Sequence, residues 1–275
     1  MAWSRVKTIL IAMLVAVNAF LILFYGINAW RENRYKDQYN QDLLATAAAL
    51  GISLDEELTQ PEVEKLLPIY VYRNERKDFE IAKKLLGECE TNEAEDGTVV
   101  FISRRGRLAL SKNGQMELSL LETTPKDEKD AVGIVKKTLR TLEQKYETVE
   151  VLQPDDGVDF CIRAKLTAVG MPVFNAALTF EFYEGRLSVS GRRILYDPQQ
   201  VRSAEIRELP GLLLSLFGHW DAMGELDKTI TGIDLGYLVK NMNGKRVTVL
   251  PVWRVSEEAC DWYINAMDGS VISAE

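Results

Sequence analysis

The sequence predicts an α+β protein: an N-terminal single transmembrane helix and a helical stalk, followed by two to three units that each combine a helix with an antiparallel sheet. Three observations lead to this fold class. A long apolar stretch lies near the N-terminus, short strand patterns joined by glycine turns fill the remainder, and the order of a helix followed by a strand meander recurs three times. A helix that covers one face of a small antiparallel sheet is a common α+β arrangement.

The apolar stretch occupies residues 6–30, and Thr8 to Tyr25 carry no charged side chain. At 1.5 Å rise per residue, a helix of about 20 mostly apolar residues crosses the roughly 30 Å hydrocarbon core of a bilayer. We therefore expect residues 1–30 to form a short tail and one membrane-spanning helix. A cleaved signal peptide is the alternative, but its apolar core would usually be only about 7–15 residues long.

The expected location is the cell membrane, crossed once, with a short cytoplasmic N-terminus and a large extracytoplasmic C-terminal region. Lys and Arg nearly balance on the two sides of the stretch, so the positive-inside rule does not decide the orientation. The orientation follows instead from size, because a tail of a few residues precedes a large polar region.

Small and polar residues recur along one side of the apolar stretch. Thr8, Ala12 and Ala16 follow one another at intervals of four residues, Ala19 lies close to the same stripe, and Asn18 lies beside it. Small side chains at this spacing let two helices approach closely, and an amide can hydrogen-bond across the pair. These five residues are the predicted partner-helix interface. The alternative is that alanine is simply frequent in such helices.

Residues 31–67 are expected to form a juxtamembrane helical stalk. Tyr39, Leu43 and Leu50 fall at helical spacing, and Gly51 is a suitable C-terminal cap. A short helix is expected to begin at Pro61 and to end near residue 67, because proline fits the first turn of a helix.

Residues 68–122 form the first predicted αβ unit. A helix candidate covers residues 78–87, and strand patterns follow at 98–103, 107–111 and 115–121. Asn113-Gly114 separates the last two of these patterns and is a strong hairpin signal.

Residues 123–196 form the second predicted unit. Thr124 and Pro125 are expected to cap and open its helix, whose apolar face includes Ala131, Val135 and Leu139. Residues 197–275 form the third unit. Its helix is expected to cover residues 212–217 and to end at Gly218, and its strands are joined by turns at Asn243-Gly244 and Asp268-Gly269.

Composition and charge exclude several function classes. The formal net charge of −8 argues against nucleic-acid binding, which needs clustered Lys and Arg. Two short basic clusters, Arg104–Arg107 and Arg192-Arg193, are expected to be turns or solvated strand faces. Cys89, Cys161 and Cys260 lie far apart and lack metal-ligand spacing, so a zinc site or a disulfide framework is not expected.

No motif for catalysis or cofactor binding is present, and the sequence predicts neither a catalytic residue nor a cofactor. His219 is the single histidine, and it is more typical of a loop or a cap than of a catalytic triad. Asp155, Asp156 and Asp159 lack the glycine position of a calcium loop, so we expect a solvated turn there. The sequence therefore predicts a protein that is not an enzyme.

Several motifs resemble those of a known family. The start Trp3-Ser4-Arg5 leading into the apolar stretch, Leu50-Gly51-Ile52, and residues 170–175 (GMPVFN) resemble the YycH/YycI family of two-component system regulatory proteins. This resemblance implies a non-enzymatic, membrane-anchored regulator. Its implied partners are the bilayer, a sensor histidine kinase of a cell-wall two-component system and a YycH-like sister protein.

The C-terminal end resembles a PepSY-type domain, on the residues 251–254 (PVWR), 262–266 (WYINA) and Asp268-Gly269. This tryptophan-rich ending departs from what the YycH/YycI resemblance leads us to expect. An inhibitor or chaperone of an extracytoplasmic protease is therefore the alternative function.

Overall fold

The computed structural model describes residues 2–55, 66–200, 206–225, 227–240, 246–258 and 260–272. The chain divides into two compact units, residues 1–60 with 209–229 and residues 61–208 with 230–275. The helices of the described chain are α1 (Ala2–Ala49), α2 (Glu75–Leu86), α3 (Glu128–Thr141) and α4 (Leu209–Met223). The protein is a mixed α+β structure, and its described strands form one large sheet rather than the separate small sheets of the predicted units.

The strands contribute to one extended sheet. In chain order they are β1 (Ile69–Tyr72), β2 (Glu90–Glu93), β3 (Val99–Ser103), β4 (Gly106–Leu110), β5 (Gln115–Leu120), β6 (Tyr146–Leu152), β7 (Phe160–Ala168), β8 (Met171–Tyr183), β9 (Arg186–Arg192), β10 (Tyr196–Gln200), β11 (Ile230–Lys240), β12 (Arg246–Glu257), β13 (Asp261–Asn265) and β14 (Val271–Ile272).

The expectation of a membrane-spanning helix is wrong, and with it the expected single-pass membrane location. Among the residues that the structure describes, no helix combines the length and the apolar character needed to cross a bilayer.

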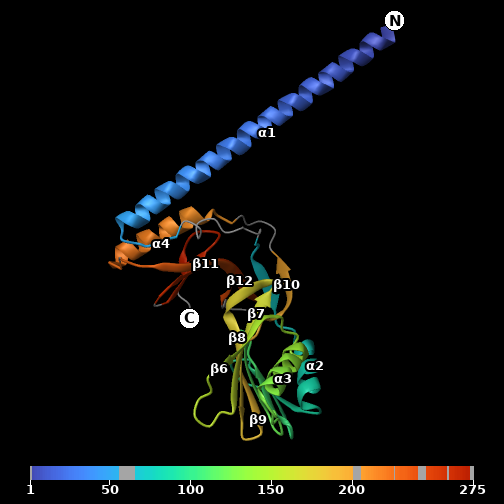
Figure 1. Ribbon diagram of the computed structural model, residues 1–275. Coiled ribbons are helices and arrows are strands. Elements are labelled where there is room, and N and C mark those ends of the chain that lie inside the picture. The colour runs from blue at the N-terminus through green and yellow to red at the C-terminus, as the bar shows by residue number, and fades with distance from the viewer. Residues whose placement is uncertain are drawn as a thin grey trace. The chain divides into compact units, whose positions relative to one another are not determined.

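Helix α1 continues without a break into the predicted stalk and ends at Ala49 (Figure 1). It ends where the sequence predicts, because Gly51 adopts φ +73°, a conformation that favours glycine. The Ile52 amide then donates to the Ala47 carbonyl at 2.8 Å, which closes the last turn. The short helix expected at 61–67 lies mostly outside the described residues.

In the first unit, α4 lies beside the C-terminal part of α1 and runs in the same direction (Figure 1). Gly211, near the start of α4, lies against the Tyr39 hydroxyl of α1. Beyond the ends of the two helices, the Ser53 amide donates to the Lys228 carbonyl at 2.8 Å. Both helix C-termini therefore lie at the same end of the pair.

Helix α4 extends past the end that the sequence predicts. It continues through Gly218 to Met223, because Phe217 and Trp220 are fully buried and their rings stack with centroids 5.8 Å apart. This burial outweighs the roughly 1 kcal/mol that a glycine costs inside a helix. Pro210 falls in the first turn, where its missing amide hydrogen costs nothing.

In the second unit, the order of a helix followed by strands appears twice in a matched form. Helix α2 precedes β2 to β5, and α3 precedes β6 to β9. The last strands of the two sets, β5 and β9, pair antiparallel, with Leu118 opposite Val189. The resulting strand order is β6-β7-β8-β9-β5-β4-β3-β2. The last strands of the two sets, β9 and β5, therefore lie next to each other, and the first strands, β6 and β2, lie farthest apart. We call these sets the α2 half and the α3 half.

Each half has one strand more than the predicted three-strand meander. Strand β2 consists of Glu90–Glu93, all exposed, so it has no alternation of apolar and polar residues to reveal it. Helix α3 starts at Glu128, with Asp127 as its cap, because the Asp127 carboxylate accepts from the Asp130 amide at 2.8 Å. The predicted start at Thr124-Pro125 is therefore too early.

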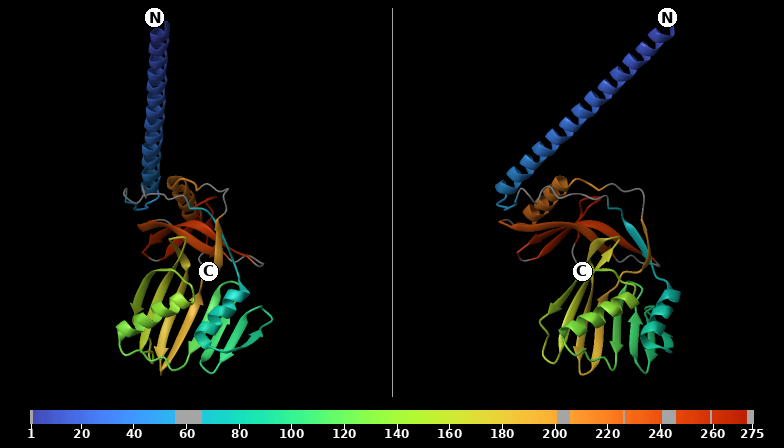
Figure 2. Two further views of the ribbon diagram at one scale, coloured as in Figure 1. Left: turned by 90° about the vertical axis from the view of Figure 1, so that its right-hand side faces the viewer. Right: turned by 45° about the vertical axis from the view of Figure 1, so that its right-hand side comes forward.

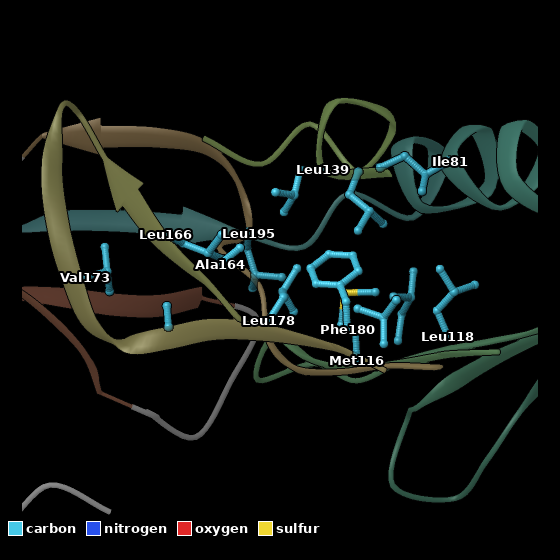
Figure 3. Packing of buried hydrophobic residues seen from close by; sticks show 14 of the residues in the cluster. Ile81, Met116, Leu118, Leu139, Ala164, Leu166, Val173, Leu178, Phe180 and Leu195 are labelled. Carbon is cyan, nitrogen blue, oxygen red and sulfur yellow. The ribbon is translucent and has the colours of Figure 1, made fainter. Parts of the chain in front are cut away.

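Helices α2 and α3 lie on the same face of the sheet, and the left view of Figure 2 shows both in front of the strands. The main core lies between these helices and the strands (Figure 3). Ile81 of α2 and Leu139 of α3 point toward Phe180 of β8 and toward Met116 and Leu118 of β5. The predicted apolar face of α3 is confirmed, because Ala131, Val135 and Leu139 are fully buried.

Strands β11 to β13 extend the sheet of the second unit through β8. Tyr237 of β11 is in parallel register with Val173 of β8. The Asn175 side chain continues this pairing, because its amide donates to the Val239 carbonyl at 2.9 Å and its oxygen accepts from the Val239 amide at 2.8 Å. The turn expected at Asn243-Gly244 lies outside the described residues. The predicted domain boundaries at 67/68, 122/123 and 196/197 stay a prediction.

Candidate functional site

The largest exposed apolar surface that the structure describes lies on helix α1. We call residues Met13–Ile27 the α1 apolar segment. Its large side chains are all more than two-fifths exposed, from 42% for Leu21 to 73% for Ile22. They are Met13, Leu14, Val15, Val17, Phe20, Leu21, Ile22, Leu23, Phe24, Tyr25 and Ile27. A contiguous apolar surface of this kind marks an interaction site.

The exposed side chains cover all sides of the helix. Residues 20–25 are six consecutive large apolar residues, and successive residues are rotated by about 100° around a helix axis. An amphipathic helix would instead carry one apolar stripe. A helix that is apolar all round is normally surrounded by protein or lipid on every side.

The predicted partner-helix interface lies partly within this segment. Ala16, Asn18 and Ala19 are exposed. The Asn18 side-chain amide donates to the Leu14 carbonyl of its own helix at 3.0 Å, and its oxygen is a further acceptor group. Thr8 and Ala12 belong to the same helix, but their side chains lie outside the described ones.

Aromatic residues and a cation mark the C-terminal boundary of the segment. The rings of Phe20 and Phe24 stack with centroids 6.2 Å apart, one helical turn from each other. Farther along, the Arg34 guanidinium lies 4.5 Å from the centre of the Trp30 ring. Arg31 and Arg34 are among the first charged residues after the segment, so the helix changes from apolar to polar character here.

A second surface feature lies where α4 packs beside the end of α1. A groove of about 510 Å³ opens between the two helices. Its lining is mostly apolar and includes several small residues; it consists of Ala45, Thr46, Ala49, Leu50, Leu214, Phe217, Gly218 and Asp221. Sequence reasoning missed this groove because it depends on the pairing of helices that are far apart in the chain.

The residues considered as catalytic or metal-binding candidates do not lie together in one site. His219 lies within α4 rather than in a loop, and its side chain is exposed. Asp155, Asp156 and Asp159 are exposed and surround a turn at Gly157, as expected. Among the described residues, no group of three or more His, Cys, Asp or Glu side chains is placed to hold a metal ion.

The expectation that Arg193 lies in a turn or on a solvated face is wrong. Its side chain is fully buried and donates to the Asp78 carboxylate at 2.7 Å and to the Tyr196 hydroxyl at 2.6 Å. The Tyr196 hydroxyl in turn donates to Asp78 at 3.0 Å. Arg73 donates to the second Asp78 oxygen at 3.1 Å. We call these four residues the Asp78 cluster.

The Asp78 cluster ties the two halves of the second unit together. Asp78 belongs to α2, whereas Arg193 follows β9 of the α3 half. Burial raises the pKa of the Tyr196 hydroxyl above its ordinary value of 10.0, so the hydroxyl stays protonated and able to donate. Buried charges are tolerated where they are paired and hydrogen-bonded. The cluster is therefore a structural joint, and no described groove opens onto it.

The thiols give no sign of a shared site. Cys89 and Cys161 are half-buried, Cys260 is exposed, and the three form no disulfide with one another. Burial and the nearby Glu181 carboxylate raise the pKa of the Cys161 thiol, which disfavours the thiolate form.

Comparisons with known proteins show weak structural similarity. No protein-family profile and no curated protein matches the chain. An uncharacterized protein from Eubacterium rectale is 12% identical over 82% of this chain and 89% of its own, with a TM-score of 0.46. The C-terminal domain of Bacillus megaterium YpeB is 10% identical over 74% of this chain and 98% of its own, with a TM-score of 0.32. Similarities at this level support no conclusion about function, and the resemblance to the YycH/YycI family stays a prediction.

Proposed function

We propose that the protein is a non-enzymatic regulatory subunit that binds a sensor histidine kinase through the α1 apolar segment. The observation that carries the proposal is this segment, in which consecutive large apolar side chains are exposed on every side of one helix. Leaving such a surface in water costs about 25 cal/mol per Å² of apolar area, so a partner that covers it gains substantial free energy.

The distribution of apolar residues determines what kind of partner fits. One partner helix covers one face, whereas the α1 apolar segment needs cover on all sides. A partner that presents several apolar helices meets this need. The sequence resemblance to the YycH/YycI family supplies the identity, a cell-wall sensor histidine kinase together with a YycH-like sister protein.

Within the segment, Ala16 and Ala19 would make the closest contact. Both are exposed and lie on adjacent positions of one helix face, three residues apart. Small residues let helix axes approach closely, which strengthens packing over the whole length of the contact. The amide oxygen of Asn18, which is an exposed residue, would accept a hydrogen bond from the partner.

The test is site-specific photo-crosslinking in cells that contain the kinase. A photoreactive residue replaces Ala16 or Ile22 in the segment and, as a control, Val151 on β6, which is also exposed at 44%. The proposal predicts kinase adducts from the α1 positions and none from Val151. Adducts at all three positions, or at none of them, would contradict the proposal.

A further inference from the structure

We infer that the groove between α1 and α4, defined above, binds an amphipathic helix of a partner protein that carries a Lys or Arg one turn beyond its apolar stripe. The inference is independent of the α1 apolar segment, because the groove residues begin at Ala45, well beyond Ile27. Shape, composition and charge of the groove each support this occupant.

The shape of the groove suits a third helix. The lining residues of α1 are Ala45, Thr46, Ala49 and Leu50, and those of α4 are Leu214, Phe217, Gly218 and Asp221. On α4 they fall at positions i, i+3, i+4 and i+7, which is about two turns, and on α1 at i, i+1, i+4 and i+5, which is about one and a half turns. Each helix therefore contributes one face to a continuous wall. A helix laid in such a groove makes contacts at positions i, i+3 or i+4, and i+7.

The residues that line the groove are small at the positions where the backbone of a partner helix would approach. Ala45, Ala49 and Gly218 are exposed, while Phe217 forms a buried apolar base. At Gly218, no atom apart from the chain neighbours and the local helix backbone lies within 4 Å of the place where a β-carbon would stand, so the space there is open. Small residues on both walls allow a partner helix to pack closely, as in other small-residue helix contacts.

The negative charge at one end of the groove favours a partner helix with a positive charge at that end. Helices α1 and α4 run in the same direction, and neither has a basic residue in its last turn. Each C-terminus carries a partial charge of about −0.5, and these two charges add at one end of the groove. Asp221 places an exposed carboxylate there, while the nearby Lys228 ammonium is engaged by Glu225 at 2.9 Å. A cation on the incoming helix would complement this end.

The test uses the full-length chain and a displayed library of helical peptides of about five turns, with apolar stripes and randomised flanking positions. The groove variant is Gly218→Leu, which fills the open space, and the matched control is Gly133→Leu. Gly133 lies on the exposed side of α3 and likewise has no atom within 4 Å of a β-carbon position. Both changes improve helix propensity, so both variants should fold.

We expect enriched peptides with Lys or Arg beyond the apolar stripe, bound at least tenfold more weakly by Gly218→Leu and equally well by Gly133→Leu. Asp221→Asn should weaken the same peptides a few-fold and reduce the salt dependence of binding. The inference fails if no peptide is enriched, if the enriched peptides lack a cation at that position, or if Gly218→Leu binds them normally. Self-association of the chain that Gly218→Leu abolishes would also overturn it, because the occupant would then be a second copy.

Discussion

Helix α3 and the α1 apolar segment use apolar residues in opposite ways. In α3, Ala131, Val135 and Leu139 occupy one face and are fully buried, while Lys136, Lys137 and other charged residues face water. In the α1 apolar segment, large side chains cover all sides and stay exposed. The apolar face of α3 is covered by the sheet of its own unit. The apolar side chains of the α1 segment are not covered by the described residues. This difference is consistent with the proposal that α3 serves stability and α1 serves binding.

The largest effect on stability is expected where the α3 half joins the α2 half. Replacing Asp78 with Ala should reduce the free energy of unfolding by about 3–5 kcal/mol, because it leaves the buried Arg193 charge without its partner carboxylate. Urea unfolding measures the change. The control is Glu80→Ala, on the same helix, which breaks an exposed pair with Arg76 and should cost about 0–1 kcal/mol. Equal effects of the two changes would show that the Asp78 cluster is not a joint.

The next prediction tests the comparison of the two helices directly. Leu139→Ala in α3 should reduce the free energy of unfolding by about 2–5 kcal/mol, because it opens a cavity in the main core. Ile22→Ala in the α1 apolar segment should change it by no more than about 0.5 kcal/mol, because Ile22 is 73% exposed. Thermal and urea unfolding of both variants provide the measurement. Similar losses in both would mean that Ile22 is buried within the protein itself.

A smaller effect is expected at Tyr237, whose hydroxyl donates to the Leu67 carbonyl at 2.9 Å. Tyr237→Phe removes this hydrogen bond and should cost about 0.5–1.5 kcal/mol at neutral pH. Burial raises the pKa of Tyr237 from 10.0 to about 12, because the charged phenolate is disfavoured there.

This pKa shift also predicts a pH dependence. The stabilisation from the protonated hydroxyl is fully present below the unfolded-state pKa of about 10 and is lost as the pH rises through about 12. Unfolding measured between pH 9 and pH 12 should therefore show a steeper decline in the natural chain than in Tyr237→Phe. Identical slopes would show that Tyr237 titrates as it does in the unfolded chain.

Local patterns in the sequence predict much of the second unit. The strands β3, β4 and β5 and the turn at Gly114, which has φ +90°, follow from alternation and from the Asn-Gly signal. The buried face of α3 follows from helical periodicity. These features depend on residues that are near one another in the sequence, so periodicity and turn chemistry reveal them.

Features that depend on distant residues could not be predicted. The pairing of β5 with β9 joins residues about 70 positions apart, for example Leu118 with Val189, and no local pattern specifies it. Arg193 looks like a surface residue in the sequence, because its partner Asp78 lies 115 positions away. The groove between α1 and α4 could not be predicted either, because the two helices are far apart in the sequence. In the candidate interface, the sequence locates the apolar stretch but wrongly makes it a membrane span.

The proposed function requires that the α1 apolar segment be a binding surface. The most direct measurement is the affinity of the full-length chain for the purified sensor kinase, compared between the natural sequence, Ile22→Ala and Ile22→Asp. A buried carboxylate is costly at an apolar interface, so Ile22→Asp should weaken binding at least about 100-fold and Ile22→Ala far less. Both variants should unfold at the same urea concentration as the natural chain. An unchanged affinity for Ile22→Asp would contradict the claim.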